Sequence, residues 1–209
     1  MTASLYAQYR TALLMIDLHN DFMSEVGKLY DRIKGSGERV GMFLNLRRIQ
    51  AMVPGADTPV FILPDPRSYP GDFDHWQHMN LVQKSSWEAQ IFPAGSWGGE
   101  WHPEVGPKDG DITIREHCAQ SLFADIDLDA QPQAAVYSKI NLVVLAADTC
   151  IEPTGRQGME IENGSRATLV RDATATFSAE CLHTVHEIID PTFAHPIVAD
   201  EVLMAQLLG

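Results

Sequence analysis

Residues 142–156 read LVVLAADTCIEPTGR, the most informative stretch of this sequence. The run at 142–147 is apolar throughout, which is typical of a parallel strand that is covered on both faces. It passes through a short turn into a segment with helical spacing, whose first turn begins near Cys150. The stretch therefore predicts a strand, a turn and a helix, with a thiol at the start of the helix.

The same alternation of apolar runs and helical patterns extends along the 209-residue chain. It predicts a single α/β domain over residues 1–209, built on a mainly parallel sheet. Further strands are expected at 12–16, 60–63, 112–115, 167–170 and 196–198. Helices are expected at 41–52, 149–161, 178–189 and 199–208.

A long connection at 64–111 interrupts this rhythm and carries all four tryptophans of the chain. It follows the end of a strand, which is the edge where open α/β sheets bind ligands. One interpretation is a partly helical cap that supplies an aromatic pocket from Trp76, Trp87 and Trp97. The other is a satellite hydrophobic cluster or a subunit interface, where Trp is also enriched. The sequence leaves both interpretations open.

Charge and cysteine usage narrow the classes of partner and compartment. A formal net charge of −13 argues against nucleic acid, which is held by clustered Lys and Arg, and against anionic membrane surfaces. No apolar run is long enough to predict a transmembrane helix. Cys118, Cys150 and Cys181 cannot all pair within one chain, so a reducing cytoplasm and at least one free thiol are expected.

Two side chains carry the candidate chemistry. Asp17 closes the apolar run at 12–16, where burial can raise its pKa towards values useful for acid/base catalysis. The alternative is a carboxylate that caps the following turn. Cys150 would meet unpaired backbone N–H groups and the positive end of a helix dipole, which favour a thiolate. Its alternative is a small apolar residue packed under the helix.

Five segments, in order, resemble the isochorismatase-like hydrolase superfamily, which includes nicotinamidases and N-carbamoylsarcosine amidase. Together they extend the resemblance over nearly the whole chain, from about residue 11 to residue 208. The segments are DLHNDF at 17–22, WGGEWHPEV at 97–105, EHCAQSLFADIDLD at 116–129, DTCIEPTGRQGME at 148–160 and LVRDATATFS at 169–178.

The resemblance implies a three-layer α/β/α sandwich of Rossmann-like type, with a parallel sheet usually of six strands, assembled as a dimer or tetramer. Members generally use an Asp, a Lys and a Cys. The Asp corresponds to Asp17 and the Cys to Cys150. The resemblance also implies a cis peptide between Ala146 and Ala147, and an oxyanion hole formed by the backbone N–H groups of Ala147 and Cys150.

The sequence departs from the family pattern at the Lys, whose position aligns with Glu116. A carboxylate there disfavours a thiolate at Cys150, which a cation would stabilise. Asp17, Glu116 and a thiolate would place three negative charges in one pocket, so at least one carboxylate is expected to be protonated at neutral pH. One hypothesis is that Glu116 binds a cationic or N–H-rich part of the substrate.

The other pocket residues give weaker signals. His19 replaces a common Gln of the first motif, and Phe22 and Phe123 match aromatic positions that line the family pocket, with core packing as the alternative. Cys118 neighbours Glu116 and is a further pocket candidate. Cys181 is expected to be structural, and the histidines at 183 and 186 are expected on an exposed helix face.

The preferred function is hydrolysis of a small amide, ureido or carbamoyl compound through a thioester on Cys150. A vinyl-ether hydrolase that uses Asp17 without covalent catalysis is one alternative, and a non-catalytic ligand-binding or redox-sensing protein is another. The expected partners are a small-molecule substrate and further copies of the chain. No metal or other cofactor is expected, because GDFDHWQH at 71–78 does not reproduce the Asp-x-His arrangement of nicotinamidases.

Overall fold

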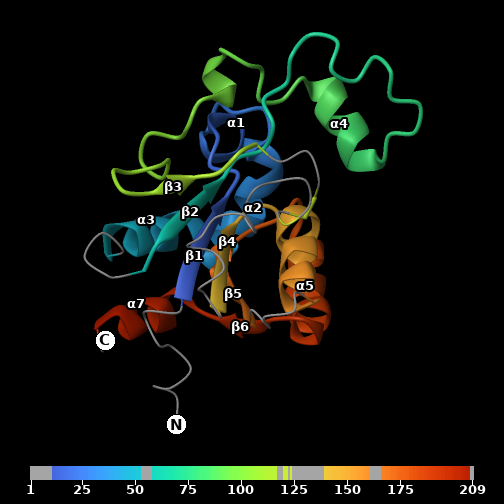
Figure 1. Cartoon of the computed structure of the whole chain (residues 1–209). Coiled ribbons are helices and arrows are strands. Elements are labelled where there is room, and N and C mark those ends of the chain that lie inside the picture. The colour runs from blue at the N-terminus through green and yellow to red at the C-terminus, as the bar shows by residue number, and fades with distance from the viewer. Residues whose placement is uncertain are drawn as a thin grey trace.

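The computed structural model describes residues 11–52, 58–116, 120–121, 123, 139–160 and 166–207, and these contain one six-stranded, all-parallel sheet. The strand order is β3-β2-β1-β4-β5-β6 (Figure 1). The strands are β1 (Thr11–Ile16), β2 (Val60–Leu63), β3 (Ile112–Thr113), β4 (Lys139–Val144), β5 (Arg166–Thr174) and β6 (His195–Ile197). This confirms the predicted α/β class and the six-stranded sheet. The order reverses between β1 and β4, and ligands of open α/β sheets bind at such a switch point, beyond the carboxyl ends of the strands.

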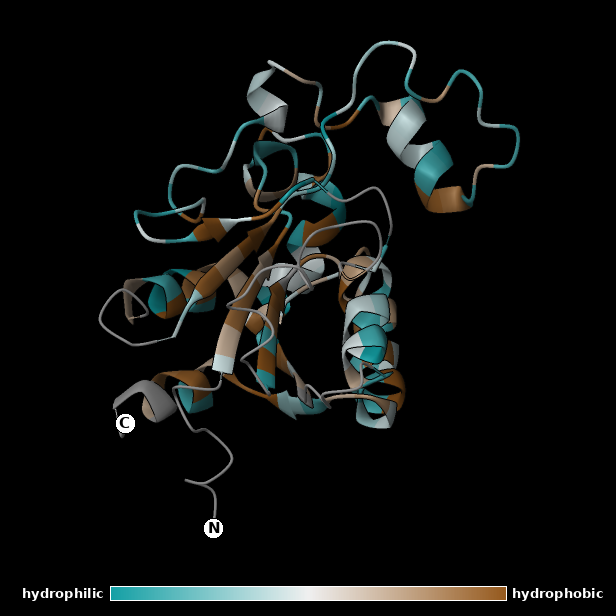
Figure 2. Ribbon diagram, in the orientation of Figure 1, coloured by the Kyte–Doolittle hydropathy of each residue, from teal (hydrophilic) through white to brown (hydrophobic). Residues whose placement is uncertain are grey.

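The central strand β1 shows why the sheet needs helices on both sides. All six of its residues are buried, and they alternate between two clusters. Leu13 and Met15 belong to one cluster, and Leu14 and Ile16 to the other. Two buried faces are the expected state of a parallel strand. In Figure 2 the strands are accordingly brown along most of their length, between helices of mixed colour.

Helices occupy both sides of this sheet, as the three-layer prediction requires. One face is covered by α2 (Tyr30–Val40), α3 (Met42–Met52) and α7 (Ala199–Leu207), which all contact β5. The opposite face carries α5 (Glu152–Glu160). Three of the four predicted helices correspond closely to α3, α5 and α7. The sequence analysis missed α2, because YDRIKGSGERV contains two glycines and few apolar residues, and glycine is a poor helix former.

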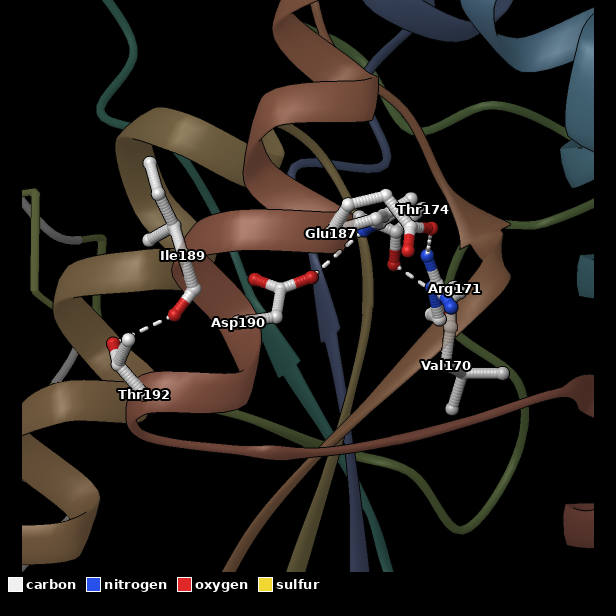
Figure 3. A network of polar contacts seen from close by, with 8 residues as sticks. Val170, Arg171, Thr174, Glu187, Ile189, Asp190 and Thr192 are labelled. Carbon is white, nitrogen blue, oxygen red and sulfur yellow. Dashed lines mark hydrogen bonds and ion pairs between the residues drawn. The ribbon is translucent and has the colours of Figure 1, made fainter.

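The fourth predicted helix, at 178–189, divides into α6 (Ala179–Thr184) and a π-helical turn, η7 (Val185–Ile189), followed by η8 (Asp190–Thr192). Figure 3 shows this region, where Arg171 of β5 reaches Glu187 in an ion pair. His186 is only 6% exposed and its Nδ1 lies 2.7 Å from the buried Asp190 carboxylate. The expectation of an exposed His186 is therefore wrong. The wide π-helical turn changes which side chains of this segment point into the core. His183 precedes that turn and is exposed.

The long connection after β2 has two parts with different surroundings. Helix α4 (Leu81–Ala89) buries none of its residues and projects from the body of the molecule in Figure 1. The later part contains η4 (Trp97–Gly99), which packs against α1 (Asn20–Met23) directly after β1. In the described ranges, no helix is long and apolar enough to cross a membrane.

Candidate active site

Asp17 lies immediately after β1, at the switch point of the sheet. Its side chain is fully buried, and its backbone N–H donates to the Leu63 carbonyl at the end of β2, at 3.0 Å. Its φ of 62° places it in the left-handed region, which aspartate enters more readily than most residues. Such strained positions cluster at functional sites. The neighbouring strand fixes Asp17 at the edge where ligands bind.

Cys150 reaches the same edge from the next strand. It lies in a π-helical turn, η6 (Ala147–Ile151), which follows β4 and continues directly into α5, and its thiol is partly buried. Burial raises the pKa of Cys150 well above its usual value of 9.0, and the charges of Asp17 and Asp65 raise it further. Asp17 also accepts a hydrogen bond from the thiol, with the same effect. Desolvation and the two carboxylates therefore outweigh the helix terminus, which was expected to favour a thiolate.

The backbone between β4 and Cys150 differs from the prediction by one residue. The cis peptide joins Leu145 to Ala146, not Ala146 to Ala147. The N–H of Ala147 is not available to an oxyanion, because it donates to the Ala175 carbonyl at 2.9 Å. The reason is that β4 ends at Val144, so residue 147 already begins the helical turn and ties it to the end of β5. The predicted oxyanion donor at Ala147 is thus not supported.

The adjacent Ala146 offers a different arrangement. The described part of the chain provides no hydrogen-bond acceptor for the Ala146 N–H, and the Ala146 carbonyl accepts from three N–H groups at once. Those donors are residues 149, 150 and 151, at 3.1–3.2 Å. Because one carbonyl is shared by three donors, the N–H of Cys150 can leave it at little cost.

Glu116 is held by a cation that the sequence analysis did not identify. Arg67, four residues after β2, donates through its backbone N–H to Glu116 Oε2 at 3.0 Å, and its guanidinium forms an ion pair with Oε1. The guanidinium also donates to the Gly99 carbonyl at 3.0 Å and lies 5.5 Å from the centre of the Trp101 ring. The expected crowding of uncompensated negative charge is thereby reduced, because Glu116 has a counter-ion.

His19, which follows β1, is part of a buried aromatic stack with Phe92 and Trp101. Its ring is 4.5 Å from that of Trp101, nearly parallel, and 5.1 Å from that of Phe92. Burial lowers the pKa of His19, and this effect outweighs the opposite influence of Asp17. The backbone of Asp65 and the charge of Asp17 both act to raise the pKa of His19, but burial is the larger effect. The imidazole is therefore neutral at neutral pH.

Polar side chains of the segment DLHNDF at 17–22 hold residues 92–102 in place beside the candidate active site. The Asn20 side chain donates to the Trp97 carbonyl at 2.8 Å, and Asp21 accepts from the Phe92 N–H at 2.8 Å. Gly98 passes so close that a Cβ there would lie 2.5 Å from the Asp21 carboxylate. Residues 92–102 are in this way positioned by the turn that carries Asp17.

The predicted aromatic pocket residues are distributed over different surroundings. Phe22 is 5% exposed and packs against Phe92 in the core. Phe123 lies against Gly158 of α5. Trp76, Trp87 and Trp97 are 43%, 41% and 47% exposed, and Trp87 lies on the projecting helix α4. The tryptophan that reaches the site residues is instead Trp101. Cys118 lies outside the described residues.

A hollow of about 400 Å³ lies elsewhere on the molecule and is lined by neither Asp17 nor Cys150. The hollow is lined by Met23, Ser24, Glu25, Tyr30, Glu38, Phe43, Arg47 and His102.

Among the residues that the structure describes, no group of three His, Cys, Asp or Glu side chains is arranged to hold a metal ion.

Asp65 and Arg67 are the site residues that the sequence analysis missed. They belong to PDPR at 64–67, directly after the strand at 60–63. The carboxyl ends of parallel strands meet at one edge of a sheet, so their position after β2 was a usable signal. These two residues lie at the start of the long connection at 64–111, directly at the end of β2.

The fold and the site together define a Rossmann-like α/β protein with a thiol and a carboxylate facing each other at the ligand-binding edge. This chain belongs to the isochorismatase family of hydrolases, because the model of the isochorismatase domain matches residues 11–201. It is 29% identical over 104 residues to the isochorismatase family protein YwoC of Bacillus subtilis (strain 168), a match that spans 50% of this chain and 53% of that protein.

Solved structures agree with this assignment at the level of the fold. An isochorismatase-like hydrolase from Alkaliphilus metalliredigens is 21% identical, with a TM-score of 0.74 over 94% of this chain and 98% of its own. N-carbamoylsarcosine amidase from Thermoplasma acidophilum is 22% identical, with a TM-score of 0.68 and coverages of 91% and 97%. A cysteine hydrolase from Pseudomonas syringae pv. phaseolicola 1448A is 20% identical, with a TM-score of 0.74 and coverages of 96% and 94%.

Proposed function

We propose that this chain hydrolyses the C–N bond of a small amide, ureido or carbamoyl compound through a thioester intermediate. The observation that supports this most directly is the hydrogen bond between the Cys150 thiol and the buried Asp17 carboxylate. A nucleophile and a base within hydrogen-bonding reach are the minimum parts for covalent acyl transfer. The cysteine hydrolase among the similar folds supports this chemistry by analogy alone.

In the first half-reaction, Asp17 takes the thiol proton as the sulfur of Cys150 attacks the substrate carbonyl carbon. The raised pKa of Cys150 means that the proton leaves during attack and not before it. The developing oxyanion is bound by the N–H of Ala146, together with the N–H of Cys150 released from its shared carbonyl. Asp17 then returns the proton to the departing nitrogen, and the C–N bond breaks.

In the second half-reaction, the carboxylate of Asp17 accepts a proton from water, which attacks the thioester carbonyl. The C–S bond breaks, the acid product leaves, and the proton on Asp17 returns to the Cys150 sulfur. One water is consumed for each amide. His19 remains neutral throughout and keeps the wall of the site dry and aromatic, together with Trp101.

The raised pKa of Cys150 also favours one second candidate, a vinyl-ether hydrolase that needs an acid at Asp17 but no thiolate. Replacing Cys150 by Ser separates the two candidates. An amide hydrolase loses its turnover, whereas an enzyme that uses only Asp17 keeps it.

The proposal is tested with a panel of small amides, ureides and carbamoyl compounds, scored for ammonia release. We expect turnover of at least one member, and its loss in the Cys150→Ala and Asp17→Asn variants. Cys181→Ala is the matched control. The thiol of Cys181, in α6, is also partly buried, but it donates a hydrogen bond to Asp148. Full activity in Cys150→Ala would overturn the thioester route.

A further inference from the structure

The hollow beside α1 is a second concave site, and neither Asp17 nor Cys150 lines it. Its volume of about 400 Å³ falls in the range of ligand pockets, about 300–1,000 Å³. The end of α1, the helices α2 and α3, and His102 of the long connection all contribute to its lining. Because these pieces are far apart in the sequence, the hollow is a product of the fold and not of a single turn.

The apolar part of the lining consists of Met23, Tyr30 and Phe43. The ring centroids of Tyr30 and Phe43 lie 5.8 Å apart, with an angle of 42° between the ring planes. Tyr30 is only 8% exposed, yet the described residues offer its hydroxyl no hydrogen-bond partner. Buried tyrosines normally have such a partner. The hydroxyl therefore requires a polar group from within the hollow.

Two carboxylates of the lining carry unpaired charge. Glu25 and Glu38 are exposed, and neither forms an ion pair with any residue that the structure describes. Arg47, in contrast, is already paired with Glu104. His102 is neutral at neutral pH, mainly because burial lowers its pKa. The lining therefore carries a net negative charge.

The basic residues nearest to these carboxylates in the sequence do not reverse the balance. Lys28 donates to a backbone carbonyl of the long connection. Arg39 directly follows Glu38 in α2, and adjacent residues of a helix face different ways. Lys34 is exposed, and its Nζ lies 5.9 Å from the centre of the Tyr30 ring. This contact shows that the Tyr30 ring can accept an ammonium group.

The hollow is connected to the two segments that frame the candidate active site. On one side, Ser24 donates to the Asn20 side chain at 3.0 Å, and Asn20 in turn donates to the Trp97 carbonyl at 2.8 Å. On the other side, the His102 N–H donates to the carbonyl of Leu18, the residue after the candidate base, at 2.9 Å. A ligand that contacts Ser24 and His102 therefore touches both segments.

We propose that this hollow binds a small organic cation with an apolar body, and that the bound cation holds α1 and residues 97–102 together. The charged group of the ligand offsets Glu25 and Glu38, and its apolar body packs against Tyr30 and Phe43. This second ligand site goes beyond the proposed function and does not depend on it.

Three probes with a similar apolar body and different charge test the proposal by isothermal titration calorimetry. They are 2-phenylethylammonium, 2-phenylethanol and 3-phenylpropanoate, which carry positive, zero and negative charge. We expect the cation to bind at least about tenfold more tightly than the other two, and this preference to shrink at about 1 M salt. Equal affinities, a preference for the anion, or no binding of the cation would overturn the proposal.

Substitutions locate the bound probe. Glu25→Gln and Glu38→Gln are each expected to weaken binding of the cation by about two- to fivefold, as for an exposed ion pair, and the double variant loses the preference for it. Glu180→Gln is the matched control, because it removes an exposed carboxylate of α6, away from the hollow, and it leaves the affinity unchanged. Asp17→Asn also leaves it unchanged. Weaker binding in Asp17→Asn alone would place the probe at the candidate active site and refute the proposal.

Hydrogen exchange tests whether the bound cation holds the two segments together. The N–H groups of Asn20 and His102 bond across between these segments, so their exchange is expected to slow by up to about tenfold when the probe is at ten times its Kd. The Lys84 N–H of the projecting helix α4 serves as the control and exchanges at the same rate. Binding of the cation with unchanged exchange at both Asn20 and His102 would overturn this part of the proposal.

Discussion

At the scale of single residues, the negative charge of Asp17 keeps the Cys150 thiol protonated in the absence of substrate, although Asp17 is also the base for that proton. Burial and the nearby carboxylates raise the pKa of Cys150, so the thiol keeps its proton until a substrate carbonyl arrives. A free thiolate would react with any electrophile in solution, because the thiolate is the nucleophilic form. The arrangement couples proton transfer to attack on a bound substrate.

The first prediction concerns the pH dependence of this thiol. Because the pKa of Cys150 is raised above 9.0, alkylation by iodoacetamide is expected to increase steadily up to pH 9 without a plateau. Asp17→Asn removes a negative charge and a hydrogen bond that both raise this pKa, so the rate at pH 8 is expected to increase. Amide turnover of the same variant falls, by about 10²–10⁴-fold, as expected for loss of an acid/base group.

Mass spectrometry of the Cys150 peptide measures this alkylation. Asp109→Asn is the control, because Asp109 is exposed and its charge is not among the causes of the shift. A plateau below pH 8 in the wild-type protein would contradict the prediction, as would a slower reaction in Asp17→Asn.

The sequence was sufficient to place Asp17 and Cys150 at the same edge, because each follows a continuous apolar run and the carboxyl ends of parallel strands meet at one edge of the sheet. It was not sufficient for the pKa of the thiol, which depends on how deeply the sulfur is buried and on Asp65 from another strand. The pairing of Glu116 with Arg67 joins residues 49 positions apart and has no local signal.

At the scale of the elements, α5 must approach the sheet closely in order to place Cys150. Gly155 makes this possible, since a Cβ there would lie 2.3 Å from the Phe193 ring. Gly35 in α2 is a matched control, because its position is open for at least 4 Å. Both residues lie in helices, so both gain the same intrinsic helix propensity when they are replaced by Ala.

The second prediction follows from this difference. Gly155→Ala is expected to lower the free energy of unfolding by about 1–3 kcal/mol through overpacking, and to reduce amide turnover, because it moves the helix that begins at Cys150. Gly35→Ala is expected to raise the free energy of unfolding by about 0.5–1 kcal/mol. Urea denaturation measures both. If Gly155→Ala proves as stabilising as Gly35→Ala, the close contact does not exist.

The elements that the sequence did not predict have a common physical reason. The strands and α3, α5 and α7 bury a regular apolar pattern, and the pattern indicated them. Helix α2 is polar and is held by its contacts with β5. Helix α4 buries nothing, so its capping box at Asn80 and Gln83 was the available local signal.

At the scale of the whole molecule, α4 is an unsupported element. A nine-residue helix is not stable in water on its own, and packing of an apolar face normally supports it. Leu81 and Trp87 of this helix are 84% and 41% exposed. The expected assembly into dimers or tetramers would cover this surface, and assembly remains a prediction.

The third prediction tests this assembly. Light scattering on a sizing column is expected to give a dimer or tetramer for the wild-type chain, and a smaller species for the Leu81→Glu, Trp87→Glu double variant. Val26→Glu is the control, because Val26 is 82% exposed on a different part of the chain. A wild-type monomer, or a double variant of unchanged size, would show that α4 is not the interface.

The measurement that tests the central claim most directly is intact-mass analysis of the enzyme quenched with acid during turnover of an amide from the panel. The account predicts a species heavier by the acyl group of that amide, located on the Cys150 peptide and absent in Cys150→Ala. Ammonia release by the wild-type enzyme with no acyl adduct, accompanied by equal release from Cys150→Ala, would contradict it.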